Sequence, residues 1–202
     1  MIPDRKDGRT RLLDAALLTI RSQGLAATSV DALCRAAGVT KGAFFHHFRS
    51  KEALAVAAAA HFGAMADGLF DAPWSLLDEP AARVLGYVAL RRAIIDGEYS
   101  AFTCLLGTMV QEAYATSPAI RAACEAGIVE HALRLEPDIA AALAAAGRLD
   151  LAAASLALHI QAVIQGGFIL AKATGDPAAA VDALDHLARY LTFLFKPKET
   201  LQ

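Results

Sequence analysis

Cysteine is scarce in this sequence, and its placement excludes a disulfide framework. The 202 residues contain three cysteines, Cys34, Cys104 and Cys124, an odd number at wide spacing. Small secreted domains that depend on disulfides carry even numbers of closely spaced cysteines. No apolar run without a polar interruption reaches the roughly 18 to 20 residues that a membrane span needs. The N-terminus, MIPDRKDGRTR, is too highly charged for a secretory signal. We therefore expect a cytoplasmic protein.

Motifs for catalysis and metal binding are also lacking. The sequence contains no nucleophile elbow, no phosphate-binding loop and no paired-carboxylate metal motif. Adjacent residues of a helix point about 100° apart, so His46 and His47 would chelate a metal poorly. The other four histidines are isolated in the sequence: His61, His131, His159 and His186. We expect no enzyme activity, no cofactor and no metal.

Strand-like alternation of apolar and polar residues persists nowhere, whereas helical periodicity runs almost from end to end. Hydrophobic residues make up 56% of the chain, and many of them are alanine, a strong helix former. We predict an all-α fold of about nine helices, with a kink or break after Glu136 caused by Pro137. Outside the segment 28–48, the expected helices span about 9–23, 51–70, 79–96, 101–114, 119–146, 150–173 and 177–195.

Two short helices joined by a tight turn are expected shortly after the first helix. Thr28 is the expected N-cap of the earlier of these two short helices. Asp31 stands where a capping box has its acidic residue. Gly38 can take the left-handed conformation that ends a helix, and Thr40 is the next expected cap. This pattern is typical of a helix-turn-helix, whose second helix can enter the DNA major groove.

The same segment resembles the DNA-binding domain of the TetR family of transcriptional regulators, over about residues 9–56. The resemblance rests on three motifs: Gly38-Val39-Thr40-Lys41-Gly42, Phe45-His46-His47-Phe48 and Ser50-Lys51-Glu52-Ala53-Leu54. It implies a three-helix DNA-binding head at 1–50 and a six-helix ligand-binding and dimerisation body at 51–202. It also implies a homodimeric repressor that binds palindromic double-stranded operator DNA and is released by a small-molecule inducer.

The charge distribution agrees with a head that meets phosphate. Residues 1–52 carry nine Lys/Arg and five Asp/Glu, whereas the remainder carries ten and sixteen. A basic head on an acidic body fits DNA binding, although small domains often differ by this much by chance.

The recognition helix should present its first turn to base edges. Lys41 can donate to guanine or bind a phosphate. If Phe44 and Phe48 point inward, Phe45 and His46 lie outward, and the resemblance implies DNA contacts at both. The family usually has tyrosine where this chain has Phe45, which lacks a phosphate-binding hydroxyl and is expected to touch a thymine methyl or sugar. The expected DNA-contacting residues are Thr28, Thr40, Lys41, Gly42, Ala43, Phe45, His46, His47 and Lys51.

The body should hold the effector and the dimer interface. The segment around Cys104 also resembles the C-terminal domain of one TetR subgroup. Candidate pocket residues, chosen as large or polar side chains that could face inward, are Phe62, Met65, Arg91, Met109, His131, Gln165 and Phe168. Leucines of the last expected helix are spaced three, four and three residues apart, like a coiled-coil seam. The expected dimer interface comprises Leu158, Phe168, Leu184, Leu187, Leu191 and Leu194, with burial within one chain as the alternative.

A second function class stays open from the sequence. The chain could be a helical ligand-binding or interaction protein without sequence-specific DNA binding, a reading that Phe45 supports. The presence of Lys41 and Lys51 favours the DNA-binding regulator.

Overall fold

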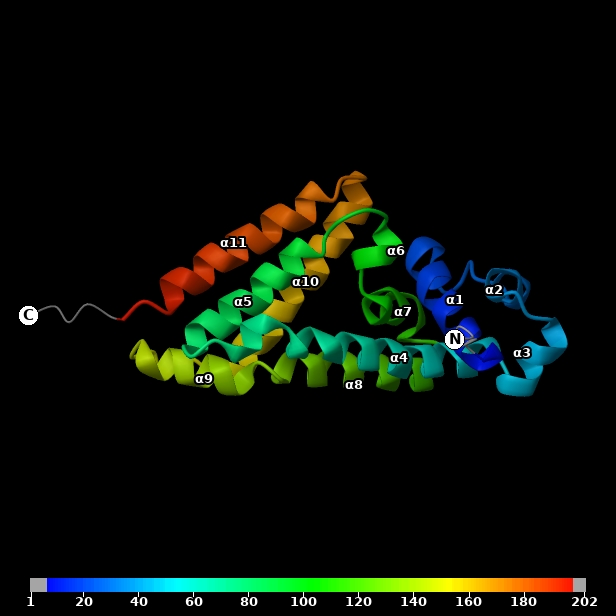
Figure 1. Cartoon of the computed structure of the whole chain (residues 1–202), viewed down its shortest axis with the longest axis horizontal. Helices are drawn as coiled ribbons and strands as arrows, with labels where there is room; N and C mark the ends of the chain where they lie inside the picture. Colours follow the sequence, from blue (N-terminus) through cyan, green and yellow to red (C-terminus); the bar gives the residue numbers. More distant parts are fainter. Residues whose placement is uncertain (1–6, 198–202) are drawn as a thin grey trace, which may run out of the picture. The chain divides into compact units, whose positions relative to one another are not determined.

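The computed structural model describes residues 7–197, and every regular element in that range is helical, which confirms the all-α prediction (Figure 1). Residues 1–6 and 198–202 lie outside the described part. In chain order the elements are α1 Gly8–Gln23, α2 Val30–Ala37, α3 Lys41–His47, α4 Lys51–Asp67, η1 Gly68–Asp71, η2 Pro73–Leu76, α5 Pro80–Ala93, α6 Tyr99–Phe102, α7 Leu105–Ala113, α8 Pro118–Leu133, α9 Glu136–Ala145, α10 Ala153–Thr174 and α11 Ala178–Leu194.

The chain forms two compact units, and each is discontinuous in sequence. The first combines residues up to Ala64 with Glu98–Gly127, and the second combines Met65–Gly97 with residues from Ile128 onward. The predicted boundary between residues 50 and 51 is a functional division and stays a prediction.

The first unit places the short helices α2 and α3 against α1, and α1 also contacts α6 and α7 (Figure 1). Its core is apolar because α1, α2, α3 and α4 each turn one apolar stripe inward. Fully buried side chains of this core include Leu12, Ile20, Leu33, Phe44, Leu54, Leu105 and Met109.

The N-cap of helix α2 lies one residue later than predicted. Ser29 is the N-cap, and its hydroxyl accepts from the Ala32 amide at 3.1 Å. The prediction of Thr28 as the cap is wrong, because the Thr28 hydroxyl instead donates to the Gly24 carbonyl at 2.6 Å. Asp31 consequently lies outside a capping box and pairs with Lys41. Gly38 ends α2 in the left-handed conformation with φ 62°, as predicted.

The expected helix 101–114 is two helices, α6 and α7, separated at Thr103 and Cys104. Thr103 is extended, and Cys104 caps α7 by accepting from the Gly107 amide with Sγ at 3.4 Å. The break has a tertiary cause, because the guanidinium of Arg21 donates to the carbonyl oxygens of Ala101 and Thr103, both at 3.3 Å. The break predicted after Glu136 lies slightly earlier, since α8 ends at Leu133 and α9 begins at Glu136, with Pro137 in its first turn.

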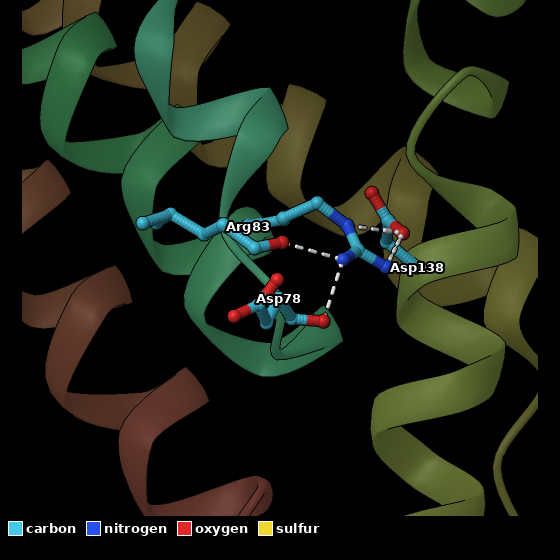
Figure 2. A network of polar contacts seen from close by, with 4 residues as sticks. Asp78, Arg83 and Asp138 are labelled. Atoms are coloured by element: carbon cyan, nitrogen blue, oxygen red, sulfur yellow. Dashed lines mark hydrogen bonds and ion pairs between the residues drawn. The ribbon is translucent and has the colours of Figure 1, made fainter.

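The second unit packs α10 along α11, with α5 against α9 and α11, and α9 against α10 (Figure 1). Arg83 links the start of α5 to α9 through an ion pair and hydrogen bonds. Its guanidinium donates to Asp138 Oδ1, with Nε at 2.8 Å, and to the carbonyl oxygens of Leu77 and Asp78 at 2.7 and 2.9 Å (Figure 2). Arg83 therefore stabilises both the turn that precedes α5 and the packing of α5 on α9.

The leucine seam of α11 lies inside this unit. Leu184, Leu187, Leu191 and Leu194 are all buried within the single chain, as is Phe168 of α10. Their assignment to a dimer interface is corrected, because side chains already covered by their own chain have no surface left for a partner. Leu158 differs, since 42% of its surface is exposed.

Two helical stretches, Lys51–Asp71 and Ala153–Thr174, are long and apolar enough to cross a membrane by length and composition, each with mean hydropathy 1.5. Both stretches are interrupted by polar side chains, such as His61 in the first and Gln161 in the second. The core helices of soluble proteins pass the same test, and α10 packs its inner face on α11.

Candidate functional site

Helix α3 presents a compact outward surface in the first unit. Thr40 caps the helix by accepting from the Ala43 amide at 3.1 Å. Phe44 and Phe48 point inward and are buried, with ring centroids 5.9 Å apart. Their burial turns the residues between them outward, so that Phe45 is 52% exposed. The exposed surface comprises Thr40, Lys41, Gly42, Phe45 and His46, with Ala43 half-buried beside it.

Lys41 lies at the first turn of α3 and pairs with Asp31 of α2, with Nζ and Oδ1 3.0 Å apart and both side chains 60% exposed. Exposed pairs of this kind stabilise a protein by only about 0 to 1 kcal/mol. The ammonium can therefore exchange Asp31 for another anion at little cost, and it is already positioned at the helix N-terminus.

The turn between α2 and α3 is fixed from α1. Arg11 donates from Nη1 to the carbonyl oxygens of Ala37 and Gly38, at 3.2 and 3.1 Å. These carbonyls end α2, where a helix leaves its last acceptors without partners. Arg11 thereby holds α3 in its place relative to α1.

Two residues that were predicted to contact DNA make contacts within the chain instead. Lys51 Nζ donates to the carbonyl oxygens of Leu25, Ala26 and Thr28, at 2.9, 3.4 and 3.0 Å. A phosphate would have to compete with these carbonyls, so the contact at Lys51 stays a prediction. Thr28 is fully buried, backbone included, so it has no exposed surface for the predicted contact with DNA.

His47 is half-buried, and its ring lies against the start of α1. A Cβ added at Gly8 would lie 3.1 Å from His47 Nε2. Sequence reasoning did not single out two exposed arginines that flank α3. They are Arg35 in the last turn of α2 and Arg49 directly after α3. Their charge and position next to α3 were visible in the sequence. Together with Lys41 they make this face basic.

The loop between α1 and α2 is bound by α7 of the same unit. The Glu112 carboxylate accepts from the Leu25 amide at 3.1 Å and from the Ala26 amide at 2.6 Å. Gly24 precedes these amides with φ 87°, and a Cβ there would meet Glu112 Oε1 at 2.4 Å. Glycine at this position therefore allows both the left-handed turn and the close approach of the carboxylate.

The predicted effector residues are divided between the two units. Phe62 and Met109 belong to the first unit, where Phe62 lies under the guanidinium of Arg21 and Met109 is fully buried. Met65 is 56% exposed.

Arg91, His131 and Phe168 come together in the second unit around Tyr87, which sequence reasoning missed. Arg91 Cζ lies 5.7 Å from the Phe168 ring centroid and 6.0 Å from that of Tyr87. Gln165 lies one turn before Phe168 on the same face of α10.

An aromatic cluster continues from Tyr87. The ring centroid of Phe70 lies 5.6 Å from those of Trp74 and Tyr87 and 5.0 Å from that of His131. The Tyr87 hydroxyl lies 2.8 Å from His131 Nε2. Burial, and secondly the nearby charge of Arg91, lower the pKa of His131 to about 4, so the imidazole is neutral near pH 7.

Comparison with known proteins gives matches over both parts of the chain. Residues 12–58 match the family described as bacterial regulatory proteins, tetR family, and residues 80–186 match the transcriptional regulator LmrA/YxaF-like C-terminal domain. The chain is 39% identical over 51 residues to the HTH-type transcriptional regulator AcrR of Shigella flexneri, covering 25% of this chain and 24% of that one. It is 46% identical over 46 residues to the HTH-type transcriptional repressor KstR2 of Rhodococcus jostii, covering 23% and 22%. These matches span about a quarter of the length of the curated relatives.

Solved structures resemble the fold over almost the whole chain. A TetR transcriptional regulator from Chloroflexus aurantiacus superposes with a TM-score of 0.80 at 25% identity, covering 92% of this chain and 94% of that one. The reduced form of Escherichia coli NemR superposes with a TM-score of 0.73 at 23% identity, covering 91% and 97%.

Proposed function

Because this chain belongs to the TetR family of bacterial transcriptional regulators, we propose that it is a repressor that binds a palindromic operator as a homodimer. A small-molecule inducer bound by the second unit releases it. The outward surface of α3 carries this proposal, because Lys41, Phe45 and His46 are exposed together on a helix whose other face is buried. The family's fold and domains indicate a transcription factor rather than an enzyme, and we propose that it acts in the cytoplasm.

Contacts with DNA follow from the chemistry of this surface. Lys41 breaks its ion pair with Asp31 and donates a hydrogen bond to a guanine or a phosphate. Gly42 and Ala43 allow close approach of the helix, while Phe45 contacts a thymine methyl or sugar and His46 a base edge. Arg35, Arg49 and His47 are placed to meet phosphates on either side, and phosphate contacts set affinity and salt dependence.

Dimerisation is supported by an apolar stripe on the outer face of α10. Leu158, Ala162, Gly166 and Ile169 are spaced four, four and three residues apart, so they share one helix face. Leu158 and Ile169 are 42% and 48% exposed, and a Cβ at Gly166 would meet nothing within 4 Å. On α11, Tyr190 and Phe193 are also exposed. Packing α10 and α11 against their copies would bury these side chains in a four-helix arrangement.

Release by an inducer requires two conformers of the dimer. The two recognition helices must lie about one DNA turn or somewhat more apart to enter successive major grooves. An inducer shifts the population away from that spacing only by the difference in its affinity for the two conformers.

The test is selection of binding sites from a random duplex library with purified full-length protein. We expect a palindrome, whose half-site spacing gives the separation of the recognition helices. Lys41→Ala should weaken binding and reduce the salt slope by about 1 if Lys41 meets a phosphate. Arg121→Ala, at an exposed cation of α8, is the charge-matched control. No enrichment at low salt would refute the proposal and favour a ligand-binding protein without DNA recognition.

A further inference from the structure

Arg91 is a buried cation without an anionic partner among residues 7–197. It is 8% exposed and belongs to α5 of the second unit. Three other arginines of this unit pair with carboxylates, Arg83 with Asp138, Arg92 with Asp185 and Arg134 with Asp67. Within the described range, Arg91 has instead the rings of Tyr87 and Phe168. Arginines are almost never buried unless paired, because removing an ion from water is costly.

Two buried donors at this place have no acceptor in the described chain. They are Arg91 Nε and the side-chain nitrogen of Gln165, Nε2. Gln165 precedes Phe168 by one helical turn, and Phe168 is the ring beside the guanidinium, so both donors belong to one neighbourhood. More than about 90% of buried polar groups in native proteins have a partner. The buried cation thus has one unmet donor of its own and a second one near it on Gln165, which together indicate a site for an acceptor with negative charge.

The other charges nearby do not neutralise Arg91. Asp67 is paired with Arg134, whose Cζ lies 4.0 Å from the Phe70 ring centroid. His131 is neutral near pH 7 and is bonded to Tyr87. The rings of Tyr87 and Phe168 flank the Arg91 guanidinium, and Phe70 stacks on Tyr87. The place combines one positive charge with flat apolar surfaces.

We propose that the second unit binds a small aromatic carboxylate, whose carboxylate pairs with the Arg91 guanidinium and accepts a hydrogen bond from Gln165. The planar body of the ligand lies against the rings of Tyr87 and Phe168. A guanidinium binds a carboxylate through two parallel hydrogen bonds, which gives both affinity and orientation. This inference rests on the proposed function, since it names the chemical class of the effector.

The test uses matched pairs that differ only in charge: benzoate with benzamide, cinnamate with cinnamamide, and 1-naphthoate with 1-naphthamide. Binding to the purified full-length chain is measured by calorimetric titration and by the shift in Tm. At least one carboxylate should bind about tenfold or more tightly than its amide. Arg91→Met should abolish this preference, whereas Arg92→Gln, at the adjacent exposed arginine, should keep it. Equal binding of acids and amides, binding of acids by Arg91→Met, or no binding by any acid would overturn the proposal.

The stability of Arg91→Met without ligand is a second, independent measurement. Replacing a buried unpaired cation by an apolar side chain of similar length should leave Tm unchanged or raise it. A clear fall in Tm would show that Arg91 is satisfied within the chain, and would also overturn the proposal. DNA binding by the unsubstituted chain is measured in parallel. Loss of DNA recognition with retained carboxylate binding rejects the proposed function alone, and the reverse result rejects this inference alone.

Discussion

The carboxylate of Glu112 should stabilise the loop between α1 and α2 through its charge and both of its oxygens. Oε1 accepts from the Leu25 amide at 3.1 Å and Oε2 from the Ala26 amide at 2.6 Å. A hydrogen bond to a charged group contributes about 1.5 to 3 kcal/mol when it is buried. The Leu25 amide is only partly buried and the Ala26 amide is exposed, so water replaces much of the loss. We expect Glu112→Ala to lower the free energy of unfolding by about 1 to 2 kcal/mol.

Glu112→Gln distinguishes hydrogen bonding from packing. Glutamine keeps the shape of the side chain but turns one acceptor oxygen into an NH₂ donor, which would face a backbone N–H. It should therefore cost nearly as much as alanine, with a fall in Tm of about 2 to 4 °C per kcal/mol for a chain of this size. Glu125→Gln, at an exposed glutamate of α8, is the control. Urea unfolding measures both variants, and a Glu112→Gln midpoint equal to that of the unsubstituted chain would refute the assigned role.

Three further predictions concern single side chains. Lys51→Ala removes a donor to three carbonyls and should lower the free energy of unfolding by about 1 to 3 kcal/mol; an unchanged urea midpoint with weaker binding to all DNA sequences would assign Lys51 to phosphate instead. Phe45→Tyr adds the hydroxyl usual in the family and should tighten operator binding about threefold to tenfold in a titration, whereas equal or weaker affinity would place position 45 away from phosphate. Because the pKa of His131 falls from 6.5 to about 4 on folding, the unfolded chain takes up that proton first, and stability should drop as the pH falls from 6.5 to 4; His131→Gln should flatten this part of the Tm profile, and an unaltered profile would contradict the shift.

Helical periodicity predicted most of the fold, because it depends on residues close together in sequence. The inward faces of Phe44 and Phe48, the turn at Gly38 and the break near Pro137 all follow from local rules. The seam of Leu184 to Leu194 was correctly seen as buried but wrongly given to a second chain. Periodicity reports which face of a helix is covered, and contains no information on which chain covers it.

The failures of sequence reasoning have long-range causes. Ser29 and Thr28 are both good caps, and the choice between them depends on whether the Thr28 hydroxyl finds the Gly24 carbonyl. No proline or glycine at Thr103 or Cys104 indicates the break there. The break depends instead on Arg21, some eighty residues earlier in the chain. Tyr87 became part of the candidate effector site only when α5 met α8 and α10 in space. Such partners are set by tertiary packing, which a single sequence does not display.

The two-part make-up of the first unit has a consequence for synthesis and for protein engineering. Glu112 and the carbonyl oxygens of Ala101 and Thr103 hold α1 and its loop, yet they follow the helix-turn-helix by dozens of residues. On the ribosome, the DNA-reading helices emerge long before these partners, so the unit reaches its final form only after α7 has been made. A chimera that exchanges residues 1–50 between relatives would separate these helices from their partners. A transplant that also carries Glu98–Gly127 would keep them together.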